Sequence, residues 1–107
     1  MNKRLELHKT LCELVNITEP DGDTHVYFDP PASFKMKYPA LKYEREGLDV
    51  LRADNAIYRT RIRYRLTWID SNPDNDMVEK LLSLPYCSYD RHYKADNLNH
   101  DILTIYY

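Results

Sequence analysis

Glycine and cysteine are scarce in this sequence, with two of each in 107 residues. Because the glycines are Gly22 and Gly47 alone, the chain cannot form a glycine-rich phosphate-binding loop, which excludes the common nucleotide-binding enzymes. Cys12 and Cys87 each stand alone, a pattern that favours reduced structural thiols over a disulfide framework or a zinc site.

Long apolar runs are also missing. No run approaches the roughly 18 to 20 residues that cross a bilayer. The start, MNKRLELHKT, has charged residues but no continuous apolar region behind them, so it does not resemble a secretory signal. We therefore expect no membrane segment and synthesis in the cytoplasm.

The composition is that of a globular protein. Hydrophobic residues make up 43% and charged residues 30% of the chain, which argues against disorder and against low complexity. A length of 107 residues fits one domain, residues 1–107, with a single two-layer core. The net charge of -2 means that the whole protein is not drawn to DNA or to an anionic membrane, so any basic surface is local.

Residues for catalysis or metal binding are poorly placed. Cys87 and His92 are the nearest candidate nucleophile and base, but five residues along one strand would put them on opposite faces. Asp90 and His92 share a strand face. His100 and Asp101 could come near them, yet no Cys-x-x-Cys or His-x-x-x-His spacing defines a metal site. The sequence predicts a non-enzymatic protein without a cofactor or a metal.

Two segments have the apolar spacing of a helix. In residues 3–16, leucines at positions 7, 11 and 14 recur at helical intervals, with charged residues elsewhere on the wheel. In residues 77–84, Met77, Val78, Leu81 and Leu82 share one helix face, and Pro85 ends the segment. Turn and N-cap formers precede this second helix, as expected for a helix start.

Strands are predicted at residues 25–29, 41–46, 58–70, 86–93 and 100–107. Runs of consecutive strands with separate helices indicate an α+β fold, in which a mixed, mostly antiparallel sheet packs against two helices. The segment 47–57, GLDVLRADNAI, has helix-like and turn-like features together, so we expect a loop or one helical turn there. Its length makes it a candidate for contact with a partner.

The longest strand, YRTRIRYRLTWID, has arginine at every second position. Arg59, Arg61, Arg63 and Arg65 share one face, and Tyr58, Ile62, Tyr64, Leu66 and Trp68 form the predicted core face. Glu44 and Glu46 lie on one face of a neighbouring strand, where cross-strand pairing would neutralise half of the arginines. Such exposed pairs contribute only about 0 to 1 kcal/mol each, so stability is a weak reason for four arginines.

Three uses of the arginine face remain open: a contact between subunits, a solvated face, and binding of DNA or another polyanion. A subunit contact is favoured because arginine binds carboxylates in a bidentate way and is enriched in interfaces. The acidic candidates for the other side of such a contact are Glu44, Glu46, Asp49, Asp54, Asp74 and Asp76.

Residues 68–107, WIDSNPDNDMVEKLLSLPYCSYDRHYKADNLNHDILTIYY, resemble a family of small proteins from the head-to-tail joining region of tailed bacteriophages of Gram-positive hosts. The upstream stretches VYFDPPASFKMKYPALKYERE and LRADNAIY look like the N-terminal half of the same family, so the resemblance covers about residues 25–107. The combination of LPYCSYDRHY, ADNLNHD and a final YY carries it.

The resemblance implies a virion structural protein of the phage neck, a tail terminator, also called a tail completion protein. Such proteins share an α+β fold and form hexameric rings that cap the tail tube, stop its polymerisation and meet the connector. The implied partners are the major tail tube protein and the head-closure or connector proteins. Passing genomic DNA would make at most a weak, sequence-blind contact. The implied location is the virion, after assembly in the host cytoplasm.

Two alternatives accompany this expectation. The short length also suits a head-closure protein of the same neck, which would have more strand and less helix. In a different class, a small nucleic-acid-binding module could use the Arg59–Arg65 face as a platform, with Tyr58 or Tyr43 stacking on bases.

Overall fold

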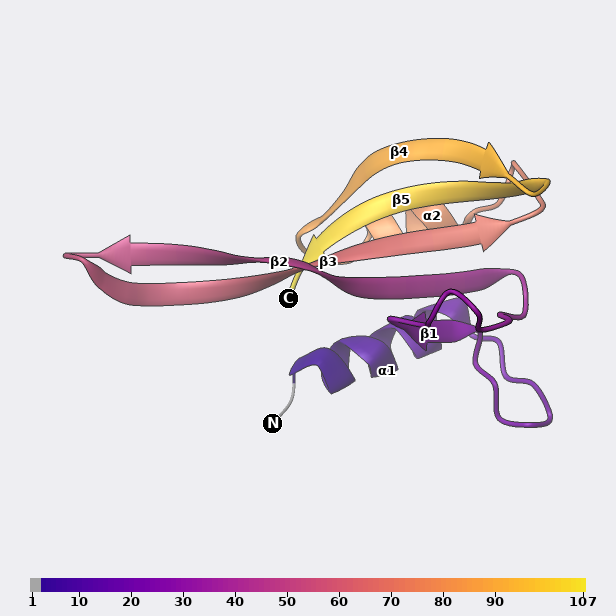
Figure 1. Cartoon of the computed structure of the whole chain (residues 1–107), viewed down its shortest axis with the longest axis horizontal. Helices are drawn as coiled ribbons and strands as arrows, with labels where there is room; N and C mark the ends of the chain where they lie inside the picture. Colours follow the sequence, from indigo (N-terminus) through magenta and orange to yellow (C-terminus); the bar gives the residue numbers. More distant parts are fainter. Residues whose placement is uncertain (1–2) are drawn as a thin grey trace.

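The computed structural model describes residues 3–107, with the side chain of Tyr58 excepted. The described residues form two helices and five strands (Figure 1). In chain order these are α1 Lys3–Val15, β1 Val26–Phe28, β2 Ala40–Ala53, β3 Ala56–Asp70, α2 Met77–Leu82, β4 Cys87–Ala95 and β5 Leu98–Tyr106. The predicted order of helix, strand, strand, long strand, helix, strand and strand is confirmed.

The strands form one sheet in the order β1-β2-β3-β5-β4. Strand β1 runs parallel to β2, and every other neighbouring pair is antiparallel. Tight turns join β2 to β3 and β4 to β5, and two neighbours connected in this way must run antiparallel. The predicted α+β fold with a mixed, mostly antiparallel sheet is therefore confirmed.

Both helices contribute to one core on one face of the sheet. Leu7, Leu11 and Val15 of α1 and Met77 and Leu81 of α2 are buried in a single cluster with the strands. The strand residues of that cluster are Val26, Leu41, Tyr43, Tyr64, Leu66, Trp68, Leu103 and Ile105. Cross-strand pairs such as Tyr43 with Leu66, and Leu66 with Leu103, place these side chains on the same face.

The predicted core face of the long strand is confirmed at three positions. Tyr64, Leu66 and Trp68 are all buried. Ile62 is only half-buried, because it lies just beyond Arg63, the last residue of β3 that pairs with β5. Tyr58 was also predicted to be buried, but its side chain lies outside the described part of the chain.

The prediction of a loop or helical turn at 47–57 is wrong. Strands β2 and β3 continue through this segment and meet at a two-residue turn, Asp54 and Asn55, with φ of 53° and 64°. Two left-handed residues match the twist of a hairpin, and Asp and Asn tolerate that conformation better than most residues. The same Ala-Asp-Asn sequence turns β4 into β5, where Asp96 and Asn97 have φ of 53° and 61°.

This hairpin projects beyond the rest of the sheet. The last pair that joins β3 to β5 is Arg63 with Tyr106, and β1 pairs with β2 only as far as Tyr43. Residues 47–62 are therefore a two-stranded extension, here called the arm, which runs away from both helices (Figure 1). The arm helps to give the molecule its elongated dimensions of 50 × 29 × 28 Å.

Candidate interface on the arm

The arm has two chemically different faces. The cross-strand pairs Asp49 with Arg61 and Leu51 with Arg59 lie on one side, here called the arginine face. The pairs Leu48 with Ile62, Val50 with Thr60, and Arg52 with Ile57 lie on the other, here called the apolar face. Since Ile62 and Tyr64 point the same way along β3, the apolar face continues the core-facing side of the sheet.

Among the described residues, neither helix covers Leu48, Val50 or Ile57 on the apolar face of the arm. Leu48 is 57% exposed, Val50 39% and Ile57 62%. A two-stranded hairpin is marginally stable in water without further packing, and a contiguous exposed apolar patch usually marks an interaction site. The arm is therefore the candidate interface of this chain, and it coincides with the segment that the sequence indicated as a candidate for contact with a partner.

The arginine stripe divides into two halves. Nε of Arg65 lies 3.1 Å from Oε2 of Glu46, and Nη1 of Arg65 lies 3.9 Å from Oε1 of Glu44. Nη1 of Arg63 lies 3.2 Å from Oδ1 of Asp49, and Nε of Arg63 lies 3.2 Å from Oε1 of Glu46 without hydrogen-bond geometry. The predicted cross-strand pairing with Glu44 and Glu46 is confirmed, and it occupies Arg63 and Arg65 within their own subunit.

Gly47 makes room for the Arg63 side chain. A Cβ atom at position 47 would lie 2.6 Å from Nη2 of Arg63, closer than two such atoms can approach. The guanidinium therefore rests against the bare backbone of β2. Interaction with the Tyr106 side chain, followed by the charges of Asp49 and Glu46, raises the pKa of Arg63.

Arg59 and Arg61 form the other half of the stripe. Within residues 3–107, no side-chain carboxylate lies within ion-pair distance of either guanidinium. Arg59 is exposed. Arg61 lies over the Tyr106 ring, 4.8 Å from its centroid, and its buried Nε has no hydrogen-bond partner among the described residues. These two arginines can still pair with carboxylates of another chain.

Two clefts flank the base of the arm. The first, here called the α1 cleft, has a volume of about 500 Å³ between α1, the segment 84–86, the end of β5 and residues 59–61 of β3. Leu7, Leu84, Pro85 and Ile105 give it an apolar lining, and Lys3, Glu6, Arg59 and Arg61 supply its charges.

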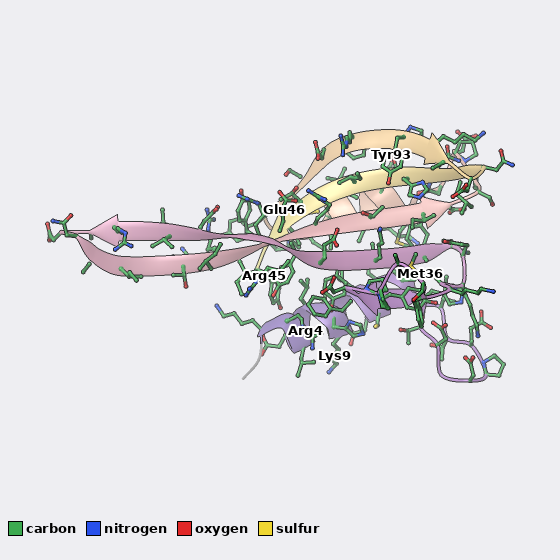
Figure 2. The ribbon with its side chains drawn as sticks, in the orientation of Figure 1. Arg4, Lys9, Met36, Arg45, Glu46 and Tyr93 are labelled. Atoms are coloured by element: carbon green, nitrogen blue, oxygen red, sulfur yellow. The ribbon has the colours of Figure 1, made fainter. Side chains whose placement is uncertain are left out.

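The second cleft, of about 550 Å³, is more polar and lies between α1 and the start of the arm. Arg4 and Arg45 line it together with Asp29 and Glu44. Figure 2 shows Arg45 on the α1 side of the sheet and Glu46 on the opposite side. The Arg4 guanidinium lies 4.3 Å from the centroid of the Phe28 ring, a cation–π contact that occupies part of this cleft.

Tyr43 cannot stack on a nucleic-acid base, which corrects that part of the nucleic-acid hypothesis. Its side chain is 1% exposed in the core. Its hydroxyl lies 2.7 Å from Nδ1 of His8 and accepts a longer bond of 3.4 Å from Nη1 of Arg4. Burial raises the pKa of Tyr43, and burial together with the charge of Arg4 lowers the pKa of His8.

Cys87 and His92 do not lie on opposite faces of β4, contrary to the prediction from their spacing, although the two residues do not meet. A bulge between Tyr89 and Arg91 shifts the alternation of β4, so that Cys87 and His92 face the same side. They pair with Ile105 and Asp101, however, which separates them by roughly 13 Å along the sheet. Burial raises the pKa of Cys87 to about 11, so its thiol is protonated at neutral pH.

The described residues contain no cluster of three or more His, Cys, Asp or Glu side chains with the geometry of a metal site. None of the helices in residues 3–107 has the length and apolar character needed to cross a membrane. No family model, curated protein or solved structure matches this chain. The function must therefore be argued from the arm and its surroundings.

Proposed function

We propose that this chain is a ring-forming structural protein at the joint between the head and tail of a tailed bacteriophage, in the role of a tail terminator. The observation that carries the proposal is the arm. It exposes Leu48, Val50 and Ile57 on one face, and on the other it carries Arg59 and Arg61, for which residues 3–107 offer no ion-pair partner. A projecting element of this kind costs stability unless a partner covers it. The location in the phage neck is inferred from the resemblance over residues 25–107.

A ring requires a heterologous contact, in which two different surfaces of each subunit meet and the rotation closes. The arm and the body of this molecule are two such surfaces. Six copies are expected from the resemblance, with the tail tube protein on one side of the ring and the connector on the other. Arg59 and Arg61 serve the contact between subunits, whereas Arg63, Arg65, Glu44 and Glu46 hold the arm in shape within each subunit.

Head closure is the second candidate within the same neck. Strands account for 47% and helices for 18% of the chain, and a strand-rich composition is what the head-closure alternative requires. Both candidates use the same arm and differ in their neighbours. A terminator contacts the tail tube, whereas a head-closure protein contacts the connector without meeting the tube.

Immunogold electron microscopy on phage particles whose genome encodes this chain tests the proposal. Gold at the upper end of the tail, including the upper end of isolated headless tails, is the expected result. Label on tailless heads but never on isolated tails would favour head closure. Label at the distal tail tip, or protein that remains in the lysate and is absent from particles, would overturn both.

An electrophoretic shift assay at several salt concentrations tests the nucleic-acid alternative. We expect weak binding at most, because the net charge is -2 and two of the four arginines are already paired. Submicromolar affinity with a steep salt dependence would contradict a purely structural role.

A further inference from the structure

We infer that the tip of the arm docks into the α1 cleft of a second copy of this chain. The inference deepens the proposed function and rests on it, since it names the partner of the arm and the place where the arm binds. The occupant of the cleft is defined as the turn Asp54–Asn55 with the flanking apolar residues Val50 and Ile57.

The two surfaces match in polarity. The α1 cleft is lined by Leu7, Leu84, Pro85 and Ile105, and the exposed ring of Tyr86 stands at its edge. The arm tip presents Val50 and Ile57, the latter 62% exposed. Leu7 and Ile105 are already buried in the core of their own subunit. Docking therefore removes the exposed parts of Pro85 and Tyr86 and of the two arm residues from water, which is the main driving force for association of such surfaces.

The two surfaces also match in charge. Lys3, Arg59 and Arg61 around the cleft outnumber its single acidic side chain, Glu6. Asp54 at the tip of the arm makes no ion pair within residues 3–107. The other acidic residues of this region, Glu44, Glu46 and Asp49, are engaged with Arg63 and Arg65. Asp54 is therefore the carboxylate of the arm that can form an ion pair with Arg59 or Arg61 of a neighbouring subunit.

An arm cannot reach the cleft of its own subunit. Cross-strand pairing runs from Gly47 with Arg63 to Ala53 with Ala56, with one register shift between Leu51 and Arg52, and this ladder holds the tip of the arm away from its base. Figure 1 shows this extension leading away from α1 and α2. The cleft lies at the base. A second molecule must supply the occupant, and the resulting contact of tip with base is heterologous, as a ring requires.

The cleft also offers backbone groups. The β3–β5 ladder ends at Arg63 with Tyr106, followed by one bond from the amide of Tyr107 to the carbonyl of Ile62. Beyond it, residues 59–61 form a sheet edge that no other described strand covers. An exposed edge is a template for strand pairing, so a docked arm can add hydrogen bonds to the apolar contact.

Disulfide trapping in trans tests the inference. One chain carries Ile57→Cys and a second carries Tyr86→Cys, both in a background with Cys12→Ser and Cys87→Ala. Ile57 and Tyr86 are mostly exposed, so these two changes leave the core intact. The matched control pairs Tyr86→Cys with Leu51→Cys, which lies on the arginine face of the same arm.

We expect the mixed chains with Ile57→Cys to form a crosslinked dimer at least tenfold faster than the control pair under mild oxidation. Equal rates for both pairs, or no crosslink in either, would overturn the inference. Asp54→Lys should slow the crosslink, and combining it with an Arg61→Glu partner chain should restore the rate. A charge swap without any restoration would also contradict the proposed pairing.

The two proposals fail separately. If the crosslink forms but gold labels a site away from the neck, arm docking is supported and the terminator role is contradicted. If gold labels the neck but the Ile57→Cys pair crosslinks no faster than its control pair, the terminator role is supported and arm docking is contradicted.

Discussion

Arg63 and Gly47 illustrate how single residues set the shape of the arm. The missing side chain of Gly47 allows the guanidinium to lie against β2, within reach of Asp49 and Glu46. Arg61, two residues away, has no such acidic partner within the described chain. Identical side chains at equal spacing therefore have different surroundings: Arg63 is paired with carboxylates of its own chain, and Arg61 is not.

Gly47→Ala should displace the Arg63 guanidinium while leaving the strand in place. We expect the free energy of unfolding to change by less than about 1 kcal/mol, because partly exposed ion pairs contribute little. Urea denaturation at low and high salt measures this, and the variant should depend less on salt than the wild type.

Gly22→Ala is the matched control for this substitution. At Gly22 nothing lies within 4 Å of an added Cβ, but φ is +91°, so any loss there comes from backbone strain and not from a displaced ion pair. A loss above about 2 kcal/mol at position 47 would contradict the account, because the neighbouring atom is the flexible end of an arginine.

The sequence was informative about single residues where alternation was regular. Tyr64, Leu66 and Trp68 were predicted to be buried from period two alone, and they are. The cross-strand carboxylates Glu44 and Glu46 were also found. What could not be predicted was which arginines they would pair with, since that depends on the register across the bulge between Arg45 and Gly47.

At the scale of elements, α1 is attached to β2 by a polar contact beside the core. His8 approaches the Tyr43 hydroxyl at 2.7 Å, with Arg4 close by. A neutral His8 that carries its proton on Nε2 accepts this bond from the Tyr43 hydroxyl. Burial and the charge of Arg4 lower the pKa of His8, which favours the neutral form. A protonated His8 would lose the acceptor and face Arg4.

This contact predicts a pH dependence of stability. Because the pKa of His8 is lower in the folded chain than its usual value of 6.5, the unfolded chain takes up a proton first as the pH falls. The stabilisation is complete above pH 6.5 and is lost as the pH falls through the lowered pKa. The free energy of unfolding should therefore decrease from pH 7.5 to pH 5.5.

His8→Gln provides the comparison, because glutamine can accept a hydrogen bond but does not titrate. Urea denaturation at pH 7.5 and 5.5 should give a smaller pH effect in the variant than in the wild type. Equal slopes in both proteins would mean that His8 is not the group that titrates in this range.

Helices and regular strands could be predicted from the sequence, but the arm could not. The side chains of residues 48, 50 and 52 lie on one face and those of 49 and 51 on the other, as in any strand. Asp54–Asn55 is the sequence signal of the hairpin turn. The signal was weak because Asp-Asn lacks the glycine of the strongest hairpin turns and because leucines favour helices. The same Ala-Asp-Asn sequence at 95–97 also forms a two-residue turn, so its repetition is the feature of the sequence that indicates the first hairpin.

At the scale of the whole molecule, the arm gives the chain two surfaces that differ in kind. The body buries its apolar residues against α1 and α2, whereas the arm leaves Leu48, Val50 and Ile57 exposed beyond them. A two-stranded extension is marginally stable in water without further packing. We therefore propose that subunits associate through the arm.

Sedimentation velocity at increasing protein concentration tests this claim most directly. The comparison variant lacks residues 48–51 and 59–62, which shortens both strands of the arm equally. It keeps the Asp54–Asn55 turn and every fully buried core residue, and it loses only the half-buried Ile62 from the edge of the core. The account predicts that the wild type forms assemblies larger than a dimer and that the shortened chain stays a folded monomer. A wild type that remains monomeric at every concentration, or a shortened chain that associates equally well, would contradict it.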